Sequence, residues 1–376
     1  MKETLMSVLA SCVIAGSASA QTINPEVKAQ ADREWRAILE PLLPLGAELV
    51  SRIDEPENPQ LRQELYQATL GVLVGGYLTL ALLDPGYPRF VPYGGQEIFN
   101  VAGTNPDYMY FIARVADDGV YKISGYRGTT LSALFQIGSG NFIPRGDGDS
   151  YGTVTAAYEA DTLRIGKNGY FEFVLSRERP KDYKGEWREL PKSSTYVLLR
   201  QTAYNWAKEV DGRIAIQRLD TAPNRPRLGA EEVAANLKQL AAFTQNNMAM
   251  SLRLTERFRK DIPVNTMGFI SFTGNGGMPT QHYLEGPFDL QPDEALILET
   301  EVPDKCGYWG FQVTDERWTA LDWRTHMTSI NGFDAKLDKD GKFRAVVSAK
   351  DPGVPNWLDT AGYQRGIIQG RWKDCP

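Results

Sequence analysis

The sequence predicts an α+β fold that is mainly β, with helices first and two antiparallel β-sandwich modules after them, joined by a long helix. Apolar residues recur at helical spacing near the N-terminus and again over residues 228–261. Short runs that alternate polar and apolar residues, separated by turns, fill residues 108–219 and 268–372. Helices and strands that are segregated along the chain are typical of α+β proteins and not of alternating βαβ units.

The first predicted elements are helical. Residues 25–54 have an apolar helical pattern that Pro41 and Pro44 interrupt, which predicts a kinked pair of helices. A second helix is predicted for residues 59–83, because Pro59 suits the first turn of a helix and an Asp-Pro-Gly sequence follows the last apolar residue.

One stretch of this second helix, residues 65–83, is apolar enough to be weighed as a membrane span. Tyr66, Gln67 and Thr69 reduce its continuous apolar run to fewer than the roughly 20 residues that cross a bilayer. A buried core helix is therefore the preferred interpretation, and no stable membrane anchor is expected.

The strands are predicted from the alternation of inward and outward side chains. Those of the first β module cover residues 108–115, 119–126, 163–165, 169–175, 195–204 and 213–219. Those of the second cover residues 268–273, 295–301, 308–313, 343–348 and 366–372. Turns at residues 117–119, 167–169 and 339–341 contain Asp-Gly or Asn-Gly, which predicts hairpin tips.

The chain is expected to contain more than one module, because 376 residues exceed the size at which a single hydrophobic core keeps growing. The predicted parts are a signal peptide (1–20), a helical segment (21–90), a β-sandwich module (91–227), a connecting helix (228–261) and a C-terminal β-sandwich module (262–376). The long helical segment is the natural connector because a continuous apolar stripe follows one of its faces.

Residues 1–20 have the pattern of a secretory signal peptide. Lys2 lies near the start, an apolar stretch covers residues 5–15, and small residues precede a cut after Ala20. A buried N-terminal helix is the alternative interpretation. We expect a periplasmic or secreted protein whose mature chain begins at Gln21.

Removal of that segment leaves Cys306 and Cys375 as the only cysteines. In an oxidising compartment an even number of cysteines predicts a disulfide, provided that the two Cα atoms lie within bridging distance. The two histidines, His282 and His326, lack metal-binding spacing, so no metal or cofactor is predicted. The net charge of −6 and the absence of a basic tract argue against nucleic acid as a partner.

The C-terminal third contains a series of unusual short motifs. They are Asp-Glu-Ala-Leu at 293–296 with Glu299, Tyr-Trp-Gly-Phe-Gln at 308–312, Leu-Asp-Trp-Arg at 321–324, Ser-Ile-Asn at 329–331, Asp-Gly-Lys-Phe-Arg at 340–344, the run at 351–362, and Arg-Trp at 371–372. In these motifs the segment resembles the bacterial family known as the domain of unknown function 1214. Upstream, the Asn-Pro-Asp-x-x-Tyr element at 105–110 is similar to the partner family numbered 1254.

This resemblance implies tandem β-sandwich modules of jelly-roll-like form, frequently in secreted proteins. It implies no established reaction, so it supplies no mechanism. Cys306 and Cys375 bracket the segment and are not part of the family's pattern, so the predicted disulfide depends on the compartment alone.

Polar side chains lie among tryptophans in the C-terminal module, the mixture expected where polar groups fix a ligand and Trp faces bind its apolar or sugar surface. The candidates for catalysis are Asp322, Arg324 and Asn356, and the candidates for ligand binding are Trp309, Asn331, Arg344, Trp357 and Asp359. The structural alternative is that these side chains cap turns and pair across strands.

A second set lies in the first β module, where charged and aromatic residues also occur together. Its members are Asp107, Tyr110, Arg200, Gln201 and Tyr204. Regular alternation places Arg200 and Tyr204 on one face of their strand, and the sequence leaves open which face is outward.

Three functions agree with the sequence. The first is an exported protein that binds a small organic or carbohydrate-like molecule in a cleft lined by Trp, Asp and Arg. The second is a cofactor-independent hydrolase, lyase or isomerase that uses carboxylate acid/base catalysis. The third is a structural or assembly protein whose modules pack against other copies in a homo-oligomer. No serine-hydrolase motif or phosphate-binding loop decides among them.

Overall fold

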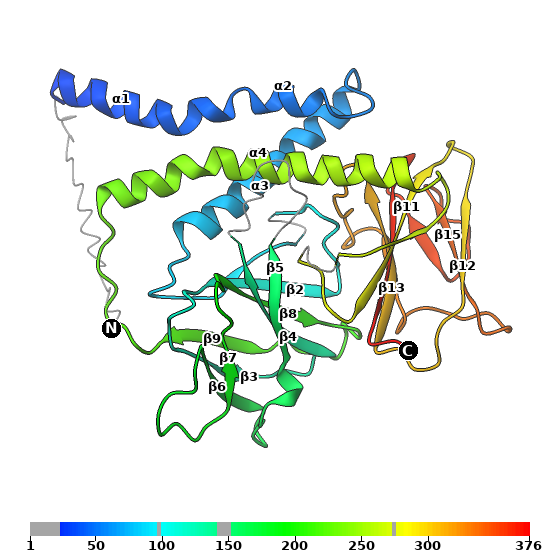
Figure 1. The fold of residues 1–376 in the computed structure, drawn as a ribbon. Helices are drawn as coiled ribbons and strands as arrows, with labels where there is room; N and C mark the ends of the chain where they lie inside the picture. The colour runs from blue at the N-terminus through cyan, green and yellow to red at the C-terminus, as the bar shows by residue number, and fades with distance from the viewer. Residues whose placement is uncertain (1–22, 96–98, 141–151, 273–275) are drawn as a thin grey trace, which may run out of the picture.

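The computed structural model describes residues 23–95, 99–140, 152–272 and 276–376, which Figure 1 shows as a ribbon. Its helices are α1 (Pro25–Leu39), the short 3₁₀ turn η1 (Glu40–Leu42), α2 (Leu45–Val50), α3 (Pro59–Ala81), the 3₁₀ turn η2 (Ala160–Thr162) and α4 (Ala230–Asp261). All other regular elements are strands, so the predicted mainly β, α+β class is confirmed.

The helical segment follows its proline and capping signals. Helix α1 ends at Leu39, and the 3₁₀ turn that follows contains Pro41, which gives the predicted kink. Helix α3 begins at Pro59, where the Asn58 side chain accepts a hydrogen bond of 3.1 Å from the Gln60 backbone N–H.

The four main helices differ in how much of their surface is covered. Helix α1 contains no buried residue, and its Val27 and Trp35 side chains are more than half exposed. Helix α3 buries Leu65, Val72 and Leu80 in a core shared with α4. Within the described residues, no helix has the length and apolar character that a bilayer span needs.

The first β module consists of two sheets that face one another. One sheet has the order β1 (Val91–Pro92), β2 (Tyr108–Arg114), β8 (Tyr196–Thr202), β4 (Ser132–Ser139), β5 (Thr153–Glu159), and the other has the order β7 (Trp187–Glu189), β6 (Tyr170–Ser176), β3 (Tyr121–Tyr126), β9 (Arg213–Arg218). Phe135 of the first sheet and Phe173 of the second meet in the core between them, with ring centroids 5.2 Å apart.

The second β module repeats this two-layer arrangement. Its larger sheet has the order β10 (Gly268–Ile270), β11 (Gln281–Asp289), β17 (Arg365–Lys373), β13 (Tyr308–Asp315), β14 (Ser329–Asn331), and its smaller sheet has the order β12 (Leu296–Thr300), β15 (Phe343–Ser348), β16 (Trp357–Asp359). Phe311 and Phe343 stack between the two sheets at 5.5 Å. The jelly-roll-like form stays a prediction.

Several strand predictions need correction. Residues 163–165 form no strand, because Leu163 closes the η2 turn by donating to the Ala160 carbonyl. Strand β4 is missing from the prediction because its residues are buried on both faces and so do not alternate. The pairs β6–β7 and β15–β16 are parallel, so the sheets are not purely antiparallel.

Only one of the three predicted hairpin tips joins two paired segments. Residues 339–341 lie between Leu337 and Phe343, which form an antiparallel bridge. Residues 117–119 instead connect β2 and β3, which belong to different sheets, and residues 167–169 lead from η2 into β6. The Asp-Gly and Asn-Gly pairs therefore mark turns at all three places. A turn that connects two different sheets can contain the same residues as a hairpin turn, so these residues alone do not identify a hairpin.

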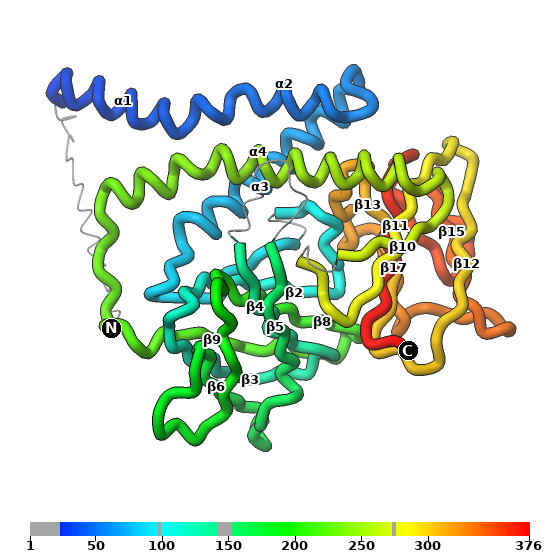
Figure 2. The backbone as a smooth tube through the Cα atoms, viewed as in Figure 1, coloured from blue at the N-terminus to red at the C-terminus, as the bar shows by residue number. Residues whose placement is uncertain are grey.

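Helix α4 runs above both β modules (Figure 2). Its Phe243 and Leu252 side chains belong to the core that covers the first module, whereas Leu254 and Phe258 belong to the core that covers the second. The long apolar stripe predicted for this segment therefore packs on two modules in succession.

A disulfide joins Cys306 and Cys375, whose Cα atoms lie 4.1 Å apart. The bond ties the start of β13 to the last residues of the chain, across a sequence separation of 69. The disulfide predicted from the sequence is therefore present in the structure.

Replacing both cysteines by serine is expected to lower the free energy of unfolding by about 2–4 kcal/mol, because the bond restricts the unfolded chain. Urea denaturation with and without a reducing agent checks this. The reducing agent should shift the wild-type midpoint to that of the double variant and leave the double variant unchanged. A wild-type midpoint that is insensitive to complete reduction contradicts the prediction.

Candidate functional site

The two β modules meet through the outer faces of their larger sheets. On the first module, Tyr110 of β2 pairs in register with Arg200 of β8, and Leu134 of β4 lies beyond Arg200. Side chains at alternate positions of neighbouring strands share one face, so these three face the second module together. Tyr108 and Leu134 pack there against Met278 and Tyr308 of the second module.

The facing sheet of the second module presents polar side chains in rows. Arg371 of β17 pairs in register with Tyr283 of β11 on one side and with Gly310 of β13 on the other. Gln369, two residues earlier, pairs with Glu285 and Gln312. Sheet faces that are buried usually carry apolar residues, so this face is unusual for a module interface.

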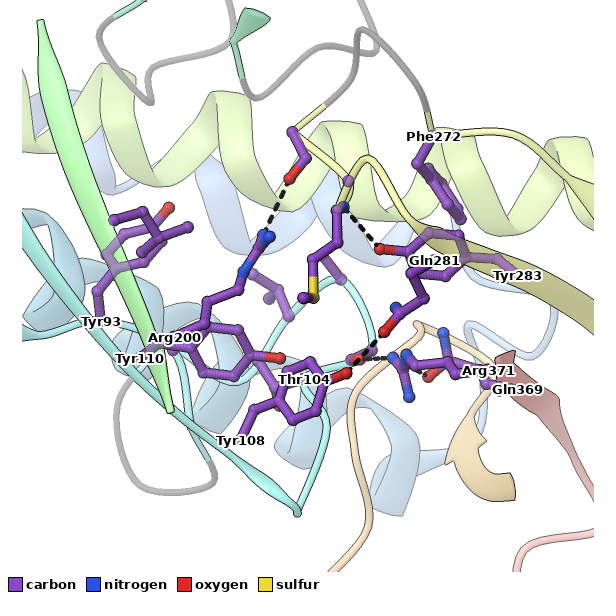
Figure 3. Close-up of a pocket in the computed structure, with 18 of the residues that line it drawn as sticks. Tyr93, Thr104, Tyr108, Tyr110, Arg200, Phe272, Gln281, Tyr283, Gln369 and Arg371 are labelled. Atoms are coloured by element: carbon purple, nitrogen blue, oxygen red, sulfur yellow. Dashed lines mark hydrogen bonds between the residues drawn. The ribbon is translucent and has the colours of Figure 1, made fainter. Parts of the chain in front are cut away.

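Between these two faces lies a cavity of about 140 Å³ (Figure 3). Arg200 and Tyr110 border it from the first module, and Gln281, Gln369 and Arg371 border it from the second. Its size is close to that of cavities that hold a benzene ring, and much larger than the space of about 10–15 Å³ that one water needs.

Arg200 is held by neutral oxygens. It donates one hydrogen bond to the Gln136 side-chain oxygen and another, of 2.9 Å, to the Gly276 carbonyl of the second module. Its guanidinium carbon lies 5.9 Å from the centre of the Tyr110 ring. The Arg200 Nε is buried and has no hydrogen-bond partner in the described part of the chain.

Arg371 is held in the same manner and is only 6% exposed. One of its terminal nitrogens donates to the Gly103 carbonyl of the first module and lies 3.3 Å from the Gln369 side-chain oxygen. Gly103 adopts a φ of +56°, and an added Cβ there would collide with Gln369. A glycine at this position therefore lets the backbone approach Arg371.

An aromatic wall closes the cavity on the side of α4. Phe272 and Trp318 stack with ring centroids 5.6 Å apart, and the Tyr283 ring lies edge-on to Phe272 at 4.8 Å. Leu254 of α4 also borders the cavity. Cationic and amide groups therefore lie close to a flat apolar surface, as is typical of small-molecule sites.

A buried hydrogen-bond cluster holds the two modules together beside the cavity. Asp107 accepts hydrogen bonds from the Tyr308 hydroxyl (2.7 Å), the Asn331 amide (3.0 Å) and the Trp206 indole (2.8 Å). The Tyr108 hydroxyl donates to Gln281 at 2.6 Å. Residues of the Asn-Pro-Asp-x-x-Tyr element therefore make the hydrogen bonds that join the two modules.

Two carboxyl groups near the cavity have raised pKa values. Burial raises the pKa of Asp107 to about 6, although its three donors favour the carboxylate. Burial raises the pKa of Glu285 to about 8; one of its oxygens accepts from Gln369 at 3.0 Å, and the other has no partner among the described residues. Neither residue borders the cavity.

The three predicted catalytic candidates lie outside this site. Asp322 accepts from the Arg324 backbone N–H at 3.1 Å and from the Thr325 hydroxyl at 2.6 Å. The Arg324 guanidinium lies over the Trp323 ring. Asn356 bonds the backbone of Lys336 through both its oxygen and its amide. Asp322 therefore bonds residues of its own turn, whereas Asn356 joins segments that lie 12 and 20 residues away in sequence.

The predicted ligand-binding residues are also dispersed. Trp309 lies in the core of the second module, and the Trp357 indole donates a hydrogen bond to the Ser348 carbonyl. Arg344 forms ion pairs with Glu299, Asp338 and Asp340. Asp359 pairs with His326, and Asn331 belongs to the Asp107 cluster. None of the eight candidates borders the central cavity or two further cavities in the described part of the chain.

The second set of the sequence analysis is closer to the cavity. Tyr110 and Arg200 border it, and Asp107 lies in the neighbouring cluster. Arg371 belongs to the polar residues and the Arg-Trp motif of the C-terminal module but is not one of the predicted site residues, and the sequence analysis does not name Gln369 or Tyr283. Strand alternation nevertheless places Gln369 and Arg371 on one face. Within the described residues, no three His, Cys, Asp or Glu side chains are grouped as a metal site requires.

Comparisons with known proteins identify relatives of this fold. Residues 285–367 match the family model described as a protein of unknown function, DUF1214. The similarity of the upstream element to the 1254 family stays a prediction. The search of curated proteins gives no match.

The solved structures that match include two that cover most of the chain. An uncharacterized protein from Burkholderia cenocepacia is 25% identical, with a TM-score of 0.82 over 93% of this chain and 95% of that chain. The VPA0106 protein from Vibrio parahaemolyticus is 12% identical, with a TM-score of 0.46 over 83% of this chain and 95% of that chain. The chain therefore shares its fold with a solved bacterial protein over nearly its full length, and it contains a segment that matches the DUF1214 model.

Proposed function

We propose that this chain is an exported protein that binds a small organic molecule in the cavity between its two β modules. The observation that supports this most directly is the composition of the cavity wall. Stacked aromatic rings, two guanidinium groups and several amide side chains border one space of about 140 Å³. A largely preformed, apolar cavity with a few fixed polar groups is the usual form of a small-molecule site.

Export is supported by the leader pattern of residues 1–20, which lie outside the described part of the chain, and by the disulfide. Disulfides persist in the periplasm and outside the cell and are rare in a reducing cytosol. The Cys306–Cys375 bond therefore suits the periplasmic or secreted location that the leader predicts.

Binding is favoured over acid/base catalysis by the position of the carboxyl groups. Asp107 and Glu285 are the buried carboxyls near the central cavity whose pKa values burial raises, and such groups are the usual candidates for a general acid or base. Burial also raises the pKa of Glu316, which borders a separate cavity beside α3. A catalytic group needs to reach a bound substrate within hydrogen-bond distance. Neither Asp107 nor Glu285 borders the central cavity, so the geometry supports a binding protein.

A thermal-shift screen of the purified protein against small metabolites of every charge tests the proposal. Ligands should raise the melting temperature of the wild type. Leu254→Trp should abolish the shift, because Leu254 borders the cavity and the larger indole side chain of Trp would fill the space that the ligand needs. Leu237→Trp, on the same helix and away from the cavity, is the matched control and should keep the shift. Ligand shifts that persist in a folded Leu254→Trp variant contradict the cavity as the binding site.

A further inference from the structure

We infer that the ligand of the central cavity is a small organic carboxylate, whose anionic group pairs with Arg200 and Arg371. This inference rests on the proposed function, because it names the chemical class that the same site binds. Two observations support it: the cavity wall has positive charges without negative ones, and several donor groups of the two guanidinium groups have no hydrogen-bond acceptor in the described part of the chain.

The cavity wall contains two cations and no opposing carboxylate. Among its described lining residues there is no Asp or Glu. No ion pair between described residues includes Arg200 or Arg371. Burying a guanidinium without an opposite charge is unfavourable by several kcal/mol, so such groups are normally paired in folded proteins.

The same protein neutralises a buried arginine elsewhere. Arg317 is 4% exposed, and it pairs with Asp315 and, at 3.2 Å, with Glu64. Arg371 is almost as deeply buried, yet its acceptors are the neutral Gly103 and Gln369 oxygens. The contrast indicates that the counter-charge at the cavity comes from outside the chain.

Neutral oxygens fix the direction of both guanidinium groups without cancelling their charge. Gln136 holds Arg200, and Gln369 holds Arg371. Nε and one terminal nitrogen of Arg371 have no hydrogen-bond partner in the described part of the chain. The Tyr110 hydroxyl accepts from the Asn105 backbone at 3.4 Å, and its own proton has no acceptor among the described residues. Several donors are thus available to a carboxylate.

Glu285 and Asp107 are the carboxyls that compete for the role of counter-ion. Glu285 lies in the row next to Arg371, but burial raises its pKa to about 8, so it is mostly protonated and uncharged at neutral pH. Asp107 is mostly ionised at neutral pH, and its oxygens already accept from Tyr308, Asn331 and Trp206. Neither carboxyl borders the cavity that the two arginines border.

The rest of the cavity wall indicates the shape and polarity of the remainder of the ligand. The stacked Phe272 and Trp318 rings and the Leu254 side chain offer a flat apolar surface. A volume of about 140 Å³ admits one six-membered ring or a short chain beside the carboxylate. The two arginines come from different modules and both border the cavity, so its wall carries positive charge on both sides.

Isothermal titration of the purified protein with benzoate, benzamide and benzylamine, and with phenylacetate and phenylacetamide, tests the inference. The carboxylates should bind at least about tenfold more tightly than the amides of the same shape, because charge-assisted hydrogen bonds are lost in the amides. Benzylamine should bind least. Arg200→Gln should reduce carboxylate affinity at least about tenfold and remove the preference over the amide.

Two further variants keep the result interpretable. Arg200→Lys keeps the charge and should keep a carboxylate preference with weaker affinity. Arg257→Gln, exposed on α4, is the matched control and should leave all affinities unchanged. Equal binding of carboxylate and amide, or an unchanged preference in folded Arg200→Gln, overturns the inference while leaving a small-molecule site in place. Binding of no compound of any charge contradicts the proposed function as well.

Discussion

Asp107→Ala is expected to lower the free energy of unfolding by about 5 kcal/mol. The substitution removes the acceptor of three donors, the buried Tyr308 hydroxyl and Asn331 amide and the half-exposed Trp206 indole. Each buried donor that loses its partner costs about 1–3 kcal/mol. The loss should be large because the cluster joins the two modules, and urea denaturation of wild type and variant measures it.

Two other variants separate this cluster from a general effect of mutation. Asp107→Asn should lose much less stability, because its oxygen can keep two donors and the Tyr308 hydroxyl can accept from its amide. Asp304→Ala, at an exposed position of the second module, should change stability by less than about 0.5 kcal/mol. A loss below about 1 kcal/mol in Asp107→Ala means that the cluster does not hold the modules together.

Glu285→Gln is expected to remove a fall in stability that the wild type shows as the pH rises. Burial raises the pKa of Glu285 from 4.5 to about 8 in the folded protein. Between these values the folded state binds the proton and the unfolded chain releases it, so the free energy of unfolding decreases with increasing pH. Over this interval Glu285 accounts for a decrease of about 4 kcal/mol.

The measurement is a series of urea denaturations from pH 4 to pH 8.5. The difference in stability between Glu285→Gln and wild type should grow in favour of the variant as the pH rises, because the amide stays neutral. Glu256→Gln, at an exposed position on α4, should follow the wild-type curve. Parallel curves for Glu285→Gln and wild type show that Glu285 is ionised in the folded protein at neutral pH, and they also weaken the charge argument for Arg371.

The sequence predicts the helices and most of the inner strands because their signals are local, whereas most edge strands are missing from the prediction. Residues 59–83 were expected to be helical and α3 covers Pro59–Ala81, since a capping residue and Pro59 mark its start. Strand β15 covers the expected residues 343–348 because its two faces differ in burial. Strand β4 escapes prediction because both of its faces are covered, one by the other sheet and one by the second module.

The position of the site does not follow from local signals. Arg200 and Arg371 are distant in sequence and belong to different modules, so only the docking of the two larger sheets brings them to one cavity. Sequence reasoning favoured the densest group of Trp, Asp and Arg, around Asp322 and Asn356, where polar side chains and tryptophans instead make turns and a core. Only knowledge of which residues of the two modules contact each other distinguishes the Arg200 and Arg371 cavity from the group around Asp322 and Asn356.

One local signal is the alternation of Gln369 and Arg371 among the Gly, Ile and Trp residues in the middle of β17. Two polar side chains on the same face of a central strand point to a polar partner for that face. The same argument applies to Arg200 of β8, which lies between Leu198 and the small Thr202 on its face. Both strands are central in their sheets, and nearly all of their residues are buried.

A crystal structure of the protein grown with the tightest-binding carboxylate tests the central claim most directly. We expect the ligand in the cavity between the two β modules, with its carboxylate within hydrogen-bond distance of Arg200 and Arg371 and its apolar part against Phe272 and Trp318. A ligand bound elsewhere on the chain, or a cavity that remains free of ligand at saturating concentration, contradicts the account.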